Sequence, residues 1–325
     1  MDKGTTVGEP QVSVCMPVYD GGRYVRESVA SVLGQTFEDF ELVVLDDAST
    51  DETPAVVASF HDPRIRYIRH EHNLGLPANF NQCLRAARCE FMMIFHADDV
   101  MLPALVGREF EVLKSSALAV LVYCATRLID AAGVVYSVPK NRWPPVTAGL
   151  DFVRAYWGSR DSGVTMSSVM LRRAVALRLG GFDEEQKHTL DADLWQRMAF
   201  EGKVAYVGEV LLSNRVHAGQ DSSRILKGSM LEERERYAAA TRALVARHGA
   251  NIDSLISRQI TRKVAADLTD LRAWDAPRSA AWQYFLATAR RFPRALLSLR
   301  LYVYLLLACL PGRVVRALKK AHRTA

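Results

Sequence analysis

The chain has 325 residues, of which 49% are hydrophobic and 24% charged, so it is long enough for one sizeable core with a smaller appendage. The formal net charge is +6, and no aromatic-rich basic motif of the RNA-binding kind accompanies it, which argues against a nucleic-acid partner. Five scattered cysteines without a CxxC pair, and a polar segment 1–10 that we expect to be flexible, indicate free thiols in a cytoplasmic protein rather than disulfides or a zinc site.

The first half of the chain alternates apolar runs with helical patterns. Runs typical of buried strands fall at residues 12–16, 40–45, 65–68, 91–95 and 118–123. Helical patterns fall at residues 24–33, 50–60, 77–88 and 103–114. We expect Ser49 or Thr50 to cap the second helix. Because the strand runs are continuous rather than alternating, the pattern predicts an α/β fold whose parallel sheet is covered on both faces.

Two of these strands end in acidic pairs. Asp46 and Asp47 follow the second strand, and Asp98 and Asp99 follow the fourth. In parallel α/β sheets the ligand lies beyond the carboxyl ends of the strands. Since Mg²⁺ and Mn²⁺ prefer carboxylate and phosphate oxygens, the pairs predict a divalent cation that binds with phosphates. The alternative is that acidic residues only end the strands as solvated turns, but their recurrence at the ends of two strands that we expect to be neighbours favours the cation.

The second half is less regular and then becomes helical. A strand is predicted at 167–171, a helix at 173–179, a helix at 191–200 and a strand at 211–216. From about residue 227 the composition shifts to Ala, Arg and Leu, which predicts a catalytic domain over 11–225 and a separate helical region over 226–325. Residues 295–310 are apolar and precede a basic tail. We therefore expect them to form a helix that lies on the anionic surface of a membrane, at the inner face of that membrane. Packing on the domain or on a second subunit is the alternative.

Several blocks of the chain resemble family 2 inverting glycosyltransferases. They read VSVCMPVYD, SVLGQTFEDFELVVLDDASTDET, NLGLPANFNQCLRAARCEFMMIFHADDVMLP, GGFDEE, LDADLWQR and RVHAGQDS, in the order of that family and over roughly residues 10–225. The resemblance implies the GT-A fold, a Rossmann-like and mainly parallel sheet. It also implies transfer of a hexose from a nucleotide-diphosphate sugar donor to an acceptor hydroxyl, with Mn²⁺ or Mg²⁺ as cofactor.

The same resemblance assigns roles to residues near the donor. Pro17 and Tyr19 match the loop that cradles the nucleotide base, and Asp47 matches the carboxylate that hydrogen-bonds it. Asp98 and Asp99 match the acidic motif that binds the metal and the ribose. The resemblance therefore predicts a donor site along the ends of the first, second and fourth strands.

Later positions match the remaining catalytic groups. Asp191 matches the catalytic base, Arg197 the basic residue that trails it, and His217 a histidine that touches the metal or the pyrophosphate. Asp193 is the competing base, and Arg197 is equally suited to pair with it at the i, i+4 spacing of a helix. Leu190 stands where the family commonly has Glu.

The motif around the fourth strand departs from the family. His96 stands where an acidic residue is usual, beside an Asn-aromatic-Asn segment that contains Asn81, as in one subset of the family. Both are secondary candidates for the site. Which atoms hold the metal is therefore left open by the sequence.

The chemistry of transfer fits the residues present, and two of the alternative functions lack the motifs that they would need. A single in-line displacement needs one base for the acceptor hydroxyl and positive charge for the departing diphosphate. A nicotinamide-dependent oxidoreductase would need GxGxxG after the first strand, where the chain has PVYDGGRY. A nucleotidyltransferase would need a Gly-rich basic loop there. A degenerate transferase fold that acts as a scaffold is the remaining alternative. We expect a glycan or lipid-linked glycan of the cell envelope as acceptor.

Overall fold

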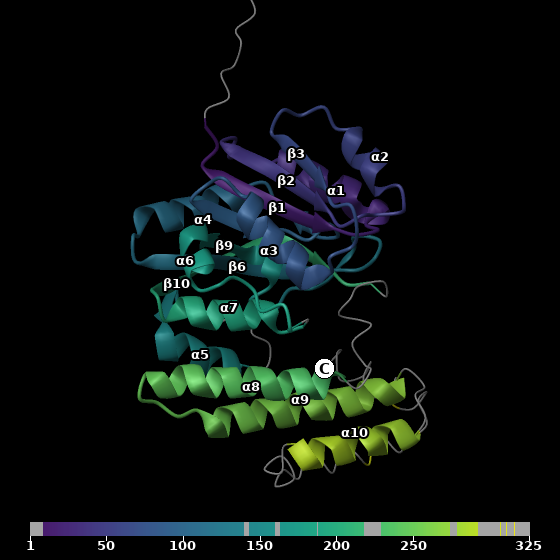
Figure 1. The fold of residues 1–325 in the computed structure, drawn as a ribbon, viewed down its shortest axis with the longest axis vertical. Coiled ribbons are helices and arrows are strands. Elements are labelled where there is room, and N and C mark those ends of the chain that lie inside the picture. Colours follow the sequence, from purple (N-terminus) through teal and green to yellow (C-terminus); the bar gives the residue numbers. More distant parts are fainter. Residues whose placement is uncertain are drawn as a thin grey trace, which may run out of the picture. The chain divides into compact units, whose positions relative to one another are not determined.

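A computed structural model describes residues 9–139, 143–159, 163–186, 188–217, 229–273 and 278–291, with single positions at 306, 310 and 315. The chain divides into two compact units. The first comprises residues 1–155 and 161–218, and the second residues 156–160 and 219–325. The first unit contains the sheet and the second contains the long C-terminal helices (Figure 1).

The first unit is built on a ten-stranded sheet with the order β3-β2-β1-β4-β9-β6-β10-β5, with β7 beside β6 and β8 beside β10. The strands are β1 Val12–Val18, β2 Phe40–Asp46, β3 Ile65–Arg69, β4 Phe91–Ile94, β5 Val100–Met101, β6 Ala119–Ile129, β7 Val135–Ser137, β8 Val146–Ala148, β9 Val169–Arg172 and β10 Lys203–Arg215. The neighbours β3, β2, β1 and β4 are parallel, as are β6 and β10, but β9 runs antiparallel between β4 and β6. The carboxyl ends of β1, β2, β4, β6 and β10 therefore lie at one edge.

The helices of the first unit follow its strands along the chain. They are α1 Gly22–Leu33, α2 Thr53–Ala58, α3 Leu76–Ala86, α4 Leu105–Ser115, α5 Gly149–Gly158, which crosses into the second unit, α6 Arg173–Arg178 and α7 Leu190–Ala199, with a 3-10 turn, η1, at Met166–Ser168. The α/β class predicted from the sequence is thus confirmed, and the sheet is mixed rather than all parallel.

Alternate side chains of β1 pack toward different helices. Val14 and Met16 join a buried cluster with Val25 of α1 and Phe110 of α4. Cys15 points the other way, and its thiol lies 3.6 Å from the Cys83 carbonyl of α3. All seven residues of β1 are buried, because both faces of the strand are covered. The continuous apolar run in the sequence has this physical cause.

The structure differs from the sequence prediction in two details that bear on the site. First, α2 begins at Thr53 after Glu52, so neither Ser49 nor Thr50 caps it. The Ser49 hydroxyl instead accepts the Asp20 amide at 3.0 Å, which joins the loop after β2 to the loop after β1. Second, the strands that carry the two acidic pairs are not neighbours, because β1 lies between β2 and β4.

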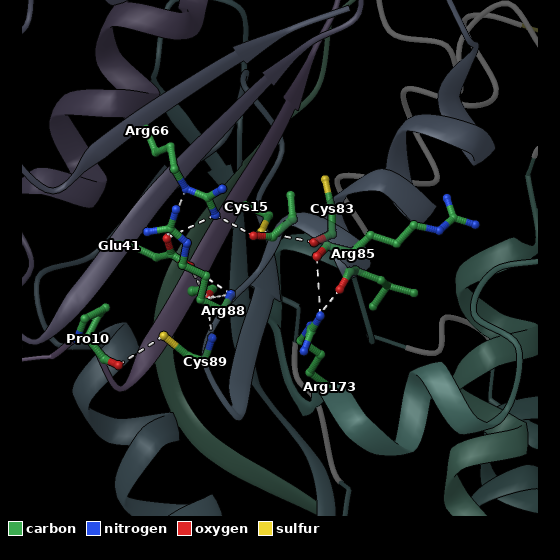
Figure 2. A network of polar contacts seen from close by, with 12 residues as sticks. Pro10, Cys15, Glu41, Arg66, Cys83, Arg85, Arg88, Cys89 and Arg173 are labelled. Atoms are coloured by element: carbon green, nitrogen blue, oxygen red, sulfur yellow. Dashed lines mark hydrogen bonds and ion pairs between the residues drawn. The ribbon is translucent and has the colours of Figure 1, made fainter.

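A buried carboxylate fastens the opposite edge of the sheet, where the strands begin. Glu41 of β2 accepts hydrogen bonds from the Ser13 hydroxyl at 2.7 Å and from the Arg88 amide at 3.0 Å. Arg66 of β3 pairs with its second oxygen at 3.1 Å, as Figure 2 shows. Because these contacts join β1, β2, β3 and the chain entering β4, they fix the register on which the functional edge depends.

The second unit is helical over the residues that the structure describes there. Its helices are α8 Ser229–Arg247, α9 Asp253–Ala273 and α10 Arg278–Arg291. A largely buried ion pair between Arg234 of α8 and Asp267 of α9 is joined by the Tyr284 hydroxyl of α10 at 3.0 Å from Arg234. None of the described helices is long and apolar enough to cross a membrane. The predicted surface helix at 295–310 lies outside the described residues, apart from positions 306 and 310.

Candidate functional site

At the edge of the sheet where the parallel strands end, called the functional edge here, the residues that follow β4 lie next to those at the end of β10. Asp99 is fully buried, and its Oδ1 accepts the Arg215 amide at 2.8 Å and the Asn214 side-chain amide at 3.0 Å. Burial, with the negative charge of Asp98 beside it, raises the pKa of Asp99 to about 6. Asp99 is therefore a carboxylate held in a low-dielectric position, where a cation would stabilise its charged form.

Asp98 and His217 face each other across the same edge. The His217 Nε2 lies 3.0 Å from the Asp98 Oδ2, although the two residues are 119 positions apart in the chain. The His217 ring also packs on Tyr24 of α1, with 4.7 Å between the ring centroids. Parallel β6 and β10, with β4 running the same way, deliver both side chains to one place. The structure thus places His217 against Asp98, which precedes Asp99 in the chain. The role of His217 at a metal or a pyrophosphate stays a prediction.

Arg215 is a residue of this site that the sequence did not single out. It is buried, its Nε donates to the Asp98 carbonyl at 2.8 Å, and one terminal nitrogen pairs with Glu27 at 2.6 Å. Its guanidinium lies over the Tyr24 ring at 4.7 Å from the centroid. These contacts fix the backbone at Asp98 and place a positively charged guanidinium next to the acidic pair. The only sequence signal was the first letter of the RVHAGQDS block.

His96 completes a group of possible metal ligands. One ligand atom each from His96, Asp98 and Asp99 lie within 4.8 Å of one another. The His96 Nε2 is buried and has no hydrogen-bond partner among the described residues. One nitrogen and two carboxylate oxygens at this spacing match the donor types of a divalent transition-metal site. The residues present therefore fit a cation, and the unpartnered nitrogen is the observation that supports the fit.

The acidic pair at the end of β2, Asp46 and Asp47, has a different arrangement. Asp47 is buried, and its two oxygens accept the Leu74 amide at 2.8 Å and the Gly75 amide at 3.0 Å. Asp46 accepts the Ser49 amide at 2.7 Å and the Tyr67 hydroxyl. Asp46 therefore braces β2 against β3, whereas Asp47 points along the edge toward the loop that precedes α3.

The loop after β1 presents Tyr19 at the surface of this edge. Pro17 is buried in β1, while Tyr19 is 52% exposed. Asp20 adopts the left-handed region with φ of 48°, and its Oδ1 accepts the Thr50 amide at 2.7 Å. Asp20 thus reverses the chain directly after Tyr19. An exposed aromatic ring next to a fixed turn is suited to stacking on a planar base.

Asp191 lies in the first turn of α7 and is half-buried. Trp195 is one turn further along the same helix face. Its ring contacts Phe182 at 6.2 Å, Phe182 contacts Phe80 at 5.5 Å, and Phe80 contacts His96 at 5.8 Å, all between ring centroids. This row of buried rings joins the Asp191 face of α7 to the metal-ligand group.

Three secondary candidates hold the chain before α7. Arg197 pairs with Asp193 at 2.7 Å and donates to the Gly181 carbonyl at 2.7 Å. The Asn81 side chain both donates to the Phe182 carbonyl and accepts its amide, each at 2.9 Å. A Cβ at Gly181, which has φ of 72°, would lie 2.5 Å from the Asn81 side-chain oxygen, so this approach requires glycine. These side chains position the segment that leads to α7, and Asp193 is engaged by Arg197.

Known proteins that resemble this chain in sequence carry glycosyltransferase names. The family model "Glycosyl transferase family 2" matches residues 13–175. An uncharacterized glycosyltransferase of Rickettsia prowazekii is 30% identical over 229 residues, 70% of each chain. The putative glycosyltransferase EpsE of Bacillus subtilis is 28% identical over 61% of this chain and 69% of its own.

Two solved structures share the fold. Residues 1–349 of TarS from S. aureus in complex with UDP-GlcNAc match with a TM-score of 0.67 and 17% identity, over 97% of this chain and 92% of that 1–349 chain. A mannosyltransferase from Pyrobaculum calidifontis in complex with GDP-Man and Mn²⁺ matches with a TM-score of 0.50 and 18% identity, over 92% of this chain and 86% of its own. At these identities the likeness concerns the fold.

Proposed function

The chain belongs to glycosyl transferase family 2 and is a glycosyltransferase with the GT-A fold, and from this premise we propose the reaction that its site performs. The proposed reaction moves a hexosyl group from a nucleotide-diphosphate sugar to an acceptor hydroxyl, with inversion at the anomeric carbon and the help of a divalent cation. The observation that carries the proposal is the convergence of Asp98, Asp99, His96 and His217 at one edge of the sheet.

The nucleotide of the donor would lie along the ends of β1 and β2. Tyr19 offers an exposed ring there, and Asp47 has a carboxylate whose oxygens each accept one backbone amide. A carboxylate oxygen can accept a second hydrogen bond, so Asp47 can also take an N–H of the base. Structural relatives hold UDP-GlcNAc and GDP-Man, which supports a nucleotide-diphosphate sugar without choosing between uracil and guanine.

The cation would be held by Asp98, Asp99 and His217, with His96 beside them. Asn214 and the Arg215 amide orient Asp99, while the Arg215 guanidinium holds the backbone of Asp98. When bound, Mn²⁺ or Mg²⁺ supplies positive charge that stabilises the departing diphosphate. The Mn²⁺ in the mannosyltransferase structure supports this choice of cations.

Asp191 is the proposed base. A carboxylate in the first turn of a helix stays ionised because the helix dipole is positive there. Ionised Asp191 can accept the proton of the acceptor hydroxyl as that oxygen attacks the anomeric carbon. Asp193 is less suited to this role because Arg197 occupies it at 2.7 Å. With one base, the acceptor oxygen would attack the anomeric carbon directly, from the face opposite the departing diphosphate. A single displacement of this kind inverts the configuration at the anomeric carbon.

An apolar surface next to the site supports the proposed acceptor class. The exposed apolar side chains there are Val134, Val135, Tyr136, Val138 and Val216. Val135 pairs with Ile129 on one side of β6, and the Val216 amide donates to the Ile129 carbonyl from the other side at 2.9 Å. Val216 directly precedes His217. An acceptor with a hydrocarbon portion, such as a lipid-linked glycan of the cell envelope, would cover this surface. A membrane-associated tail would serve the same acceptor at the inner face of the membrane.

Donor binding with and without a cation tests the proposal. We expect one nucleotide-diphosphate sugar from a panel to raise the melting temperature with Mn²⁺ or Mg²⁺ but not with EDTA; at 100 times its Kd the donor should add about 2.7 kcal/mol of stability. Asp98→Asn should abolish this gain. Asp151→Asn is the matched control, because Asp151 is a highly exposed acid on α5. If no donor binds with any cation, the proposal fails; cation-dependent donor binding without hydrolysis or transfer would favour the scaffold alternative.

A further inference from the structure

The imidazole of His96 is not explained by the fold. Its Nε2 is buried and lacks a hydrogen-bond partner among the described residues, although buried polar atoms are nearly always paired. Ser167 does not meet this need, because its hydroxyl accepts the His96 backbone amide at 3.1 Å and forms its other hydrogen bond with the Asp99 carboxylate. Phe80 packs against the ring at 5.8 Å and offers no acceptor. A buried nitrogen in such a place calls for a partner that the described part of the chain does not supply.

The surroundings of this nitrogen specify the chemistry of that partner. The Asp98 and Asp99 carboxylates each provide a ligand oxygen within 4.8 Å of a ring nitrogen of His96. Two carboxylates and an imidazole nitrogen favour a small cation over an anion or an apolar group. The backbone amide of His96 is fixed by Ser167, and the ring is fixed by Phe80. The nitrogen is thus held in place rather than recruited by movement of the chain.

Resting on the cation site of the proposed function, we propose that His96 is a ligand of the cation through Nε2 and makes the site selective for Mn²⁺ and Co²⁺ over Mg²⁺ and Ca²⁺. Imidazole nitrogen binds transition-metal ions better than Mg²⁺ or Ca²⁺, which prefer oxygen ligands. A carboxylate at this position would add a third negative charge and another hard oxygen. His96 therefore lowers the attraction for Mg²⁺ while keeping a strong ligand for transition metals.

His217 is the second histidine near this group. Its Nε2 lies 3.0 Å from the Asp98 Oδ2, so a second imidazole borders the carboxylate that faces the cation. The group within 4.8 Å contains one imidazole and two carboxylates, and the His217 imidazole lies beside it on Asp98. His217 matches a histidine of the family, whereas His96 departs from the family motif. We therefore expect substitution of His96 to change the preference for Mn²⁺ over Mg²⁺.

Cation binding without donor measures this selectivity directly. Free Mn²⁺ is followed by its electron paramagnetic resonance signal during titration, and Mg²⁺ is added as competitor. We expect the wild-type protein to bind Mn²⁺ at least tenfold more tightly than Mg²⁺. His96→Asp should lower this ratio at least tenfold, and the visible absorption of bound Co²⁺ should shift as a nitrogen ligand is replaced by oxygen. His61→Asp is the matched control, since it makes the same exchange at an exposed position after α2.

A second variant guards against misfolding. His96→Gln keeps the approximate volume and the polarity of the side chain but removes the imidazole, so it should also weaken Mn²⁺ binding relative to Mg²⁺ binding. Suppose that both His96 variants still bind Mn²⁺ with an unchanged ratio of Mn²⁺ to Mg²⁺ affinity, and that Asp98→Asn loses Mn²⁺ binding. This result would overturn the role of His96 and leave the cation site itself standing. A wild-type protein that binds neither cation would overturn the cation site of the proposed function as well.

Discussion

Asp99→Asn should stabilise the protein and at the same time disable it. Asp99 is fully buried, and its burial together with the charge of Asp98 raises its pKa to about 6, from an ordinary value of 3.8. Asparagine has nearly the same shape and carries no charge. Its side-chain oxygen can still accept the Arg215 amide and the Asn214 amide that Asp99 accepts now. The variant therefore removes an unfavourable buried charge without removing these hydrogen bonds.

The magnitude follows from proton linkage. Between pH 3.8 and 6 the folded protein holds the Asp99 proton more tightly than the unfolded chain does, so the contribution of this carboxyl to stability falls as pH rises through that window. A shift of about two units corresponds to about 3 kcal/mol above pH 7, and to about 1 kcal/mol at pH 4.5. The free energy of unfolding of Asp99→Asn should exceed that of the wild type by these amounts.

Urea unfolding at pH 4.5 and pH 8 in EDTA measures the difference in the free energy of unfolding between Asp99→Asn and the wild type. When Mn²⁺ replaces EDTA, this difference should become smaller or change sign. At 100 times its Kd, Mn²⁺ should add about 2.7 kcal/mol to the wild type and nothing to the variant. An Asp99→Asn protein that is less stable than the wild type at pH 8 in EDTA, or a difference that does not change with pH, would refute the reasoning.

Asp51→Asn is a control with the opposite sign. Burial opposes ionisation of Asp51, but hydrogen bonds from Thr53 and Gly22 outweigh it and lower its pKa. The Asp51 carboxylate therefore stabilises the fold above its unfolded pKa near 3.8, and this contribution is lost as pH falls through its lower folded pKa. Asp51→Asn should be less stable than the wild type at pH 8, with the difference shrinking only in strong acid.

Two further predictions concern catalysis and the acceptor. Asp191→Asn should lower kcat by about two to four orders of magnitude and leave donor binding unchanged, because it removes the proton acceptor alone; Asp193→Asn should lower stability instead, and a kcat loss confined to Asp193→Asn would reassign the base. Replacing Tyr136 and Val138 together by serine should raise KM for an acceptor with a hydrocarbon chain but not for a short water-soluble analogue. Equal effects on both acceptors would show that the exposed apolar surface does not contact the lipid portion.

The family and the α/β class were accessible from the sequence because they rest on local patterns. A strand covered on both faces must be apolar throughout, and β1 and β2 are buried at every position, so their runs were visible without a structure. The acidic residues that follow β2 and β4 stand out against those runs for the same reason. Strand ends in β6 and β10 were harder to place, because both continue beyond their apolar stretches, and polar Asn214 and Arg215 at the end of β10 carry no local strand signal.

What the tertiary structure decided is which of the candidate residues meet. Asp46 and Asp47 are adjacent in sequence, yet opposite strand faces send one to Tyr67 and the other to the loop before α3. Asp98 and His217 are 119 positions apart and lie 3.0 Å from each other, because β9 enters the sheet antiparallel and aligns β4 with β6 and β10. Such contacts depend on strand order and register, which arise from packing over the whole sheet and leave no trace in local periodicity.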